Sequence, residues 1–61
     1  MLVKELTAVI DNETEFAVDV GGVDTRFYDA RSLEEAIGNA EISYIGLEET
    51  WGEVYVRVEV I

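Results

Sequence analysis

The pair Gly21-Gly22 constrains the fold more than any other feature of this sequence. On both sides of it, over residues 15–20 and 23–28, hydrophobic and polar residues alternate. Such alternation is typical of half-buried strands, and two glycines between the runs favour a two-residue hairpin turn, because glycine adopts positive φ at little cost. Pairing across this turn places six side chains on one face, in the pairs Val20 with Val23, Val18 with Thr25, and Phe16 with Phe27.

Three more segments show the same period of two. Residues 6–10 are predicted to form a first strand, if the loop around Asn12–Thr14 holds three residues, and residues 54–61 form the clearest strand in the chain. The partner of that last strand runs from about Glu41 to Glu48, and its pattern changes phase near Gly46, which indicates a bulge. Residues 50–52 would then make the turn between the two.

One segment has the spacing of a helix. Ser32 and Glu35 form a capping box, in which each side chain accepts a hydrogen bond from a free backbone amide. Apolar residues follow at helical spacing up to Ala40, and Gly38-Asn39 favours a stop. So short a helix is unstable in water by itself, and we therefore expect it to pack on the sheet.

These elements predict an α+β fold in a single domain, residues 1–61. We expect one five-stranded, mostly antiparallel sheet, with the helix between the third and fourth strands and packed on one face. The sheet order 4-5-1-2-3 makes every neighbouring pair antiparallel, although other orders remain open.

The composition excludes several classes of function. The chain has 61 residues with 14 acidic and 4 basic side chains, a net charge of −10, and neither histidine nor cysteine. Nucleophilic catalysis by Ser–His or Cys–His pairs is therefore ruled out, and thiolate metal sites are absent. The charge opposes direct binding to nucleic acid or anionic lipid. We expect no enzyme activity, no cofactor and no metal.

Location follows from the same inventory. No apolar run approaches the ~20 residues that a membrane span requires, and the charged Lys4 and Glu5 come too early for a signal peptide. We expect a soluble, cytoplasmic protein, in the host cytoplasm if a phage encodes it.

The predicted topology brings three acidic connections to one end of the sheet. They are the turn after the first strand, the junction before the helix, and the turn between the last two strands. Clustered carboxylates repel one another, and a cationic partner would relieve that repulsion. Trp51 lies at the tip of the last turn, and tryptophan is enriched at interface hot spots. The predicted partner-binding residues are Asp11, Glu13, Glu15, Asp29, Glu48, Glu49, Trp51 and Glu53.

We therefore expect a non-enzymatic, acidic protein-interaction module that occupies a basic, nucleic-acid-binding surface of another protein. In size and charge it is similar to the small acidic inhibitors that bacteriophages make against host defence or DNA-handling proteins, although no motif identifies a family. The alternative is a small structural or accessory homo-oligomeric subunit whose acidity only serves solubility.

Each of these interpretations has a plainer alternative. The Trp51 ring can fold back over Tyr44 or the helix and complete a small core. Asp11, Glu13 and Glu15 alternate like the start of a calcium loop, but the required glycine and glutamate are missing further on.

Two further expectations concern the sheet face away from the helix. Asp19 and Asp24 face each other there, and we expect Arg26 to bridge them, the alternative being a cation from outside the chain. That face mixes apolar and charged residues, so we expect a homodimer through it or through an edge strand. Its predicted members are Val3, Val9, Ala17, Tyr28, Tyr55 and Ile61 among Glu5, Glu15, Asp19, Asp24 and Glu59.

Overall fold

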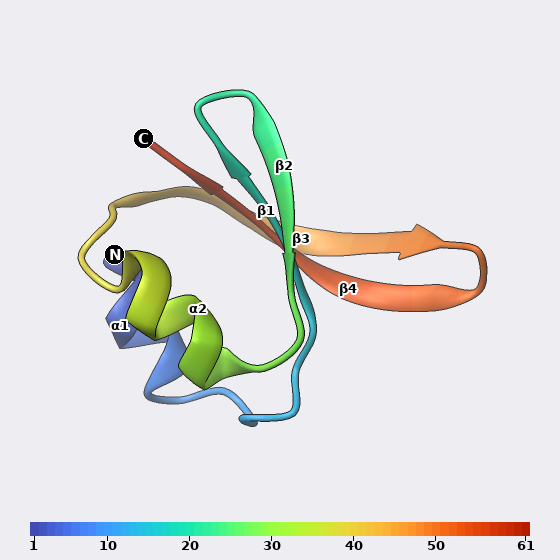
Figure 1. The fold of residues 1–61 in the computed structure, drawn as a ribbon, viewed down its shortest axis with the longest axis horizontal. Coiled ribbons are helices and arrows are strands. Elements are labelled where there is room, and N and C mark those ends of the chain that lie inside the picture. The colour runs from blue at the N-terminus through green and yellow to red at the C-terminus, as the bar shows by residue number, and fades with distance from the viewer.

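The computed structural model describes all of residues 1–61 and contains two helices and four strands (Figure 1). In chain order they are α1 (Val3–Thr7), β1 (Phe16–Val20), β2 (Val23–Phe27), α2 (Ala30–Ile37), β3 (Ile42–Thr50) and β4 (Glu53–Val60). Both helices lie together beside the sheet, and the β3–β4 hairpin extends away from them (Figure 1).

The strands form one mixed sheet in the order β2-β1-β4-β3. The α+β class is confirmed, but the five-stranded sheet is wrong, because the predicted first strand is absent. Without it, the predicted order of the other strands is the observed one. Its loss brings β1 directly beside β4, and these two strands pair in parallel, so the expectation that every pair is antiparallel is also wrong.

The segment predicted as the first strand, residues 6–10, instead consists of the end of α1 and the turn that follows it. Leu6 and Ile10 fit the alternation of a strand, but Val3, Leu6 and Ile10 also fit one face of a helix, and the structure packs these three against the core. The carboxylate of Glu5 accepts a hydrogen bond from the Leu2 amide at 2.6 Å. The next two amides, of Val3 and Lys4, donate to backbone carbonyls at the end of α2. Tertiary contacts thus supply the partners that a five-residue helix lacks by itself.

The β1–β2 hairpin has the predicted register in all three pairs, from Val20 with Val23 to Phe16 with Phe27. Gly21 and Gly22 have φ of 60° and 85°, as a type I′ turn requires. The six side chains share a face, but only Phe16 and Val18 are fully buried, since the turn end of the hairpin extends past the helices.

Helix α2 begins three residues earlier than predicted. Its N-cap is Asp29, whose carboxylate accepts a hydrogen bond from the Ser32 amide at 2.7 Å. The earlier start places Ala30, Leu33 and Ile37 on one side, facing the core. Ser32 therefore lies inside the first turn and does not cap the helix.

The β3–β4 hairpin forms as predicted, but its turn and its irregularity differ. Thr50 pairs with Glu53, so the turn consists of Trp51 and Gly52 and not of residues 50–52. The register shifts between Ile42 and Tyr44, so the bulge lies at Ser43 and not near Gly46. Gly46 pairs regularly with Arg57, and a side chain at that position would meet the ring of Tyr44. The bulge at Ser43 accounts for the change of phase, because it places Ile42 on the same face as Ile45, opposite Val60 and Val58.

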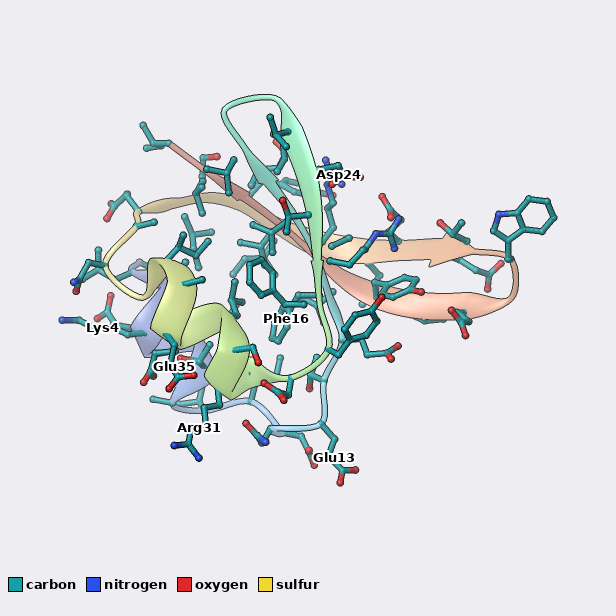
Figure 2. All side chains as sticks on the ribbon, viewed as in Figure 1. Lys4, Glu13, Phe16, Asp24, Arg31 and Glu35 are labelled. Carbon is teal, nitrogen blue, oxygen red and sulfur yellow. The ribbon has the colours of Figure 1, made fainter.

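The core lies on one face of the sheet, between the strands and the two helices. Its buried members are Val3, Phe16, Val18, Ala30, Leu33 and Val58. Phe16 is labelled between the helices and the strands in Figure 2. Val3, predicted for the opposite face, belongs to this core.

Candidate functional site

The distal part of the β3–β4 hairpin lacks the support that the rest of the sheet has. Strand β1 begins at Phe16, opposite Val56, so the hairpin beyond that row has no third strand beside it. We call residues 47–55 the arm; Figure 1 shows it projecting from the body of the protein. The arm contains three glutamates and no lysine or arginine.

Trp51 lies at the tip of the arm with 97% of its surface exposed. The interpretation that its ring folds back over Tyr44 or the helix is therefore wrong. Its φ is +55°, followed by +80° at Gly52, so the two residues form a type I′ turn. Left-handed backbone costs a bulky residue free energy, and asparagine or glycine is strongly preferred there. The Trp51 side chain thus buries little apolar surface, and its backbone conformation is unfavourable for a bulky residue.

The arm also exposes apolar side chains along one of its faces. Leu47 is 78% exposed and Val54 is 56% exposed, and both lie on the face that carries the core elsewhere in the sheet. Neighbouring Ile45 is 43% exposed. The helices cover Val58, leave its partner Ile45 partly exposed and do not reach Leu47 and Val54, so the apolar face of the sheet continues uncovered along the arm.

The predicted acidic residues form two groups at the same end of the sheet. Hydrogen bonds from the Ala30 and Arg31 amides to Asn12 hold the loop of residues 11–15 against the start of α2. Asp11, Glu13, Glu15 and Asp29 belong to this first group. Glu48, Glu49, Glu53 and Trp51 belong to the arm. The Val56 amide donates to the Glu15 carbonyl at 2.9 Å, which places the loop at the base of the arm. Figure 2 shows Glu13 on the loop, away from the tip of the arm.

Several of these carboxylates have structural partners. Hydrogen bonds from the Ser32 amide and hydroxyl lower the pKa of Asp29, in keeping with its capping role. Asp11 accepts from the Glu13 amide at 2.8 Å. Glu53 accepts from the Tyr55 hydroxyl, and this hydrogen bond raises the pKa of Tyr55.

Glu48 is different, because arginines neutralise it within the fold. It lies 3.3 Å from Arg26 and 3.5 Å from Arg57. Glu13, Glu15 and Glu49 make no side-chain hydrogen bond or ion pair with the rest of the chain. Among the predicted partner-binding carboxylates, these three are therefore available to a cation from outside the chain.

Arg57 lies at the centre of the face opposite the helices. Its guanidinium is 2.7 Å from Asp24, 3.6 Å from Asp19 and 3.8 Å from Glu59. The prediction that Arg26 bridges Asp19 and Asp24 is wrong, since Arg57 does so. The sequence did not indicate this contact, because it depends on β1 pairing with β4, which places Arg57 opposite Ala17, two residues from Asp19 on the same face.

Small residues make room for this network. Ala17 lies directly between Arg26 and Arg57 across the sheet and is fully buried, and Gly46 follows on the other side of Arg57. Arg26 also lies over the ring of Tyr55, 4.4 Å from its centroid. The two arginines thus form a row with carboxylates on both sides.

The network leaves this face negatively charged, because four carboxylates, of Asp19, Asp24, Glu48 and Glu59, contact only two guanidinium groups. Burial by itself would lower the pKa of Arg57, but the carboxylates around it, Asp24 foremost, raise it. The face is therefore neither apolar nor free for a cation at its centre, which Arg57 occupies.

No group of three or more carboxylates is placed to hold a metal ion. A surface depression along the end of α2 contains Glu34 and Glu35, but Glu34 accepts from the Thr7 hydroxyl and Glu35 pairs with Arg31. Neither helix has the length or the apolar character needed to cross a membrane.

Comparison with known proteins found no match, whether to a protein-family model, a curated protein or a solved structure.

Proposed function

We propose that this chain is a non-enzymatic, acidic protein-interaction module whose arm binds a basic surface of a partner protein. The observation that carries the proposal is Trp51, a fully exposed indole in a strained backbone position at the tip of a projecting hairpin. Strained, exposed residues of this kind cluster at functional sites, and tryptophan is a common binding anchor.

The charge distribution supports a cationic partner. The arm has no basic residue, and the unpaired Glu49 and the loop residues Glu13 and Glu15 add negative charge near it. The net charge of −10 accelerates encounter with a positively charged surface by electrostatic steering. The partner should offer an apolar pocket for the indole with lysine or arginine around it.

A surface with those properties is typical of proteins that bind nucleic acid. By covering such a surface the chain would act as a nucleic-acid mimic in charge, and in the bacterial cytoplasm it would serve as a phage-type inhibitor of a defence or DNA-handling protein. The complex should then weaken steeply as salt rises, because screened charges attract less.

The alternative of a structural subunit is favoured by one observation, the exposed Leu47 and Val54. A partner held mainly by these side chains would bind through apolar burial, and its complex would depend little on salt. Salt dependence therefore separates the two functions.

The decisive variant is Trp51→Asn. Asparagine before Gly52 is the preferred type I′ pair, so we expect the free energy of unfolding to rise by about 1 kcal/mol. We also expect binding to weaken by about thirtyfold or more, since loss of a hot-spot side chain typically costs about 2 kcal/mol or more. Thermal unfolding measures the first effect, and titration of a basic protein captured from lysate at low salt measures the second.

Charge is tested in the same titration by Glu49→Lys, with Glu35→Lys as the matched control. Both replace one exposed glutamate by lysine, but Glu35 lies on α2 and not on the arm. We expect only Glu49→Lys to weaken binding, and added duplex DNA to compete with the wild-type chain. If the Trp51→Asn and Glu49→Lys chains bind as tightly as the wild type, the arm is not the binding surface.

A further inference from the structure

We propose that two copies of this chain associate by antiparallel pairing of the outer edges of β3, centred on Gly46. This inference concerns self-association through the edge of β3, and it does not rest on the proposed partner complex. The occupant of the edge is a second copy of the same chain, and the product is a continuous eight-stranded sheet.

The outer edge of β3 is the largest unprotected edge in the structure. Strand β3 has nine residues. At its start the Ile42 amide donates to the Met1 carbonyl at 2.8 Å, and beyond Ile42 the only strand paired with it is β4. Natural edge strands are usually short, or carry lysine, proline or a bulge that blocks further pairing. Here the bulge at Ser43 and the contact of Ile42 with Met1 protect one end only. The strand contains neither lysine nor proline, and its charged side chains are Glu48 and Glu49, toward the other end.

The other edge of the sheet is better protected. Strand β2 has five residues, and Asp24 and Arg26 on it belong to the ion-pair network. The face opposite the helices is also unsuitable for a two-fold contact, because it carries an excess of carboxylates around Arg57 and would repel its own copy. Of the two routes to a dimer expected from the sequence, the structure therefore favours the edge strand.

The sequence of β3 is self-complementary when it pairs about Gly46. In an antiparallel pair that is symmetric about this glycine, Ile45 of each copy lies opposite Leu47 of the other. These side chains are on the same face, 43% and 78% exposed in the single chain, and cross-strand contact would bury part of both. On the opposite face, Tyr44 lies opposite Glu48, which places a hydroxyl donor across from a carboxylate.

Neighbouring registers are less favourable. Symmetry about Ile45 places Glu41 opposite Glu49, and symmetry about Glu48 places that carboxylate opposite its own copy. Like charges directly opposite each other destabilise a sheet. Symmetry about Leu47 pairs Ile45 with Glu49 and loses the apolar match. Gly46 is thus the centre that joins apolar side chains and keeps the carboxylates of the two edges apart.

The charge of the chain predicts how this dimer responds to salt. Each copy carries a net charge of −10, so two copies repel each other, and added salt screens this repulsion. Dimerisation should therefore strengthen as salt rises to about 1 M, where the Debye length is about 3 Å. The proposed partner complex has the opposite dependence, and one proposal can fail without the other.

The register is tested with two single-cysteine variants of the full chain, Ile45→Cys and Leu47→Cys. The protein has no cysteine of its own, so any disulfide must join the introduced thiols. When the two variants are mixed and oxidised at high salt, we expect the mixed dimer to form about tenfold faster than either homodimer, because only position 45 lies directly opposite position 47. Equal rates for all three disulfides would overturn the register.

The edge itself is tested by molar mass from light scattering. Leu47→Lys should raise the dimer dissociation constant by on the order of tenfold, since the substitution acts twice in a symmetric interface. Val23→Lys is the matched control, an exposed valine of β2 on the same face. A wild-type chain that remains monomeric at high salt and high micromolar concentration, or equal weakening by both variants, would contradict the proposal.

Discussion

At the scale of single residues, Arg57 is the side chain on which most other charges depend. It neutralises carboxylates from β1, β2, β3 and β4, whereas Arg31 contacts only Glu35 at 3.8 Å with both side chains exposed. Exposed pairs such as the latter contribute little to stability. Removing one partner of a convergent network instead leaves several like charges without compensation.

We therefore expect Arg57→Gln to lower the midpoint of thermal unfolding at neutral pH and low salt, because Asp19, Asp24 and Glu48 then repel one another. The loss should shrink as salt rises, since screening weakens that repulsion. Arg31→Gln is the control and should leave the midpoint unchanged. Circular dichroism of the three chains across a salt series measures both effects, and a salt-independent loss would assign Arg57 a packing role only.

At the scale of elements, the helices are held by contacts from outside themselves. Both are short, and their ends bond to other segments: α1 to the carbonyls at the end of α2, and α2 through Asp29 and the Asn12 loop. The helix cap therefore also positions the acidic loop at the base of the arm. A change at Asp29 should affect both.

The lowered pKa of Asp29 gives this cap a pH dependence. Because the pKa of Asp29 in the folded protein lies below its ordinary value of 3.8, the stabilisation is fully present above pH 3.8 and is lost as pH falls through the folded pKa. Asp29→Asn keeps a capping oxygen without the charge. We expect the wild-type unfolding midpoint to fall more than that of Asp29→Asn between pH 6 and about pH 3. Parallel acid titrations of the two chains would refute this role of the charge.

At the scale of the whole molecule, the protein has a small core and a large exposed apolar surface. Seven residues are buried, while Leu47, Trp51 and Val54 of the arm are exposed together with apolar residues at the turn end of β1–β2. Domains of this size have only about 3–5 kcal/mol of stability from a single core. Each core side chain therefore matters to the whole fold, and the arm contributes little to it.

Leu33→Ala tests this division. Truncating a fully buried leucine costs about 2–5 kcal/mol, which approaches the whole stability of the domain, so the variant should be largely unfolded at room temperature. Val9→Ala removes an 81% exposed side chain and should change the free energy of unfolding by less than about 0.5 kcal/mol. Urea titration followed by circular dichroism measures both. A folded Leu33→Ala chain would show that stability comes from elsewhere.

The sequence alone determined the features that depend on neighbouring residues. Gly21-Gly22 and the alternation around it set the β1–β2 register, and the same reasoning placed the β3–β4 hairpin and its turn. Net charge and the absence of histidine and cysteine are properties of composition, and they limit the chemistry whatever the fold. Local patterns carry this information because turn geometry fixes pairing over a few residues.

The tertiary structure decided what depends on distant segments. Residues 3–10 fit the period of a helix and that of a strand, and packing against α2 and the core selected α1.

The parallel pairing of β1 with β4 joins segments about forty residues apart, and it determines that Arg57, not Arg26, neutralises Asp19 and Asp24. The same pairing determines that Trp51 extends into solvent, because β1 pairs with β4 only from Val56 onward and leaves the tip of the hairpin without a third strand. Contacts between remote segments leave no periodic pattern in a single sequence, since their energy comes from burial and pairing that exist only after folding.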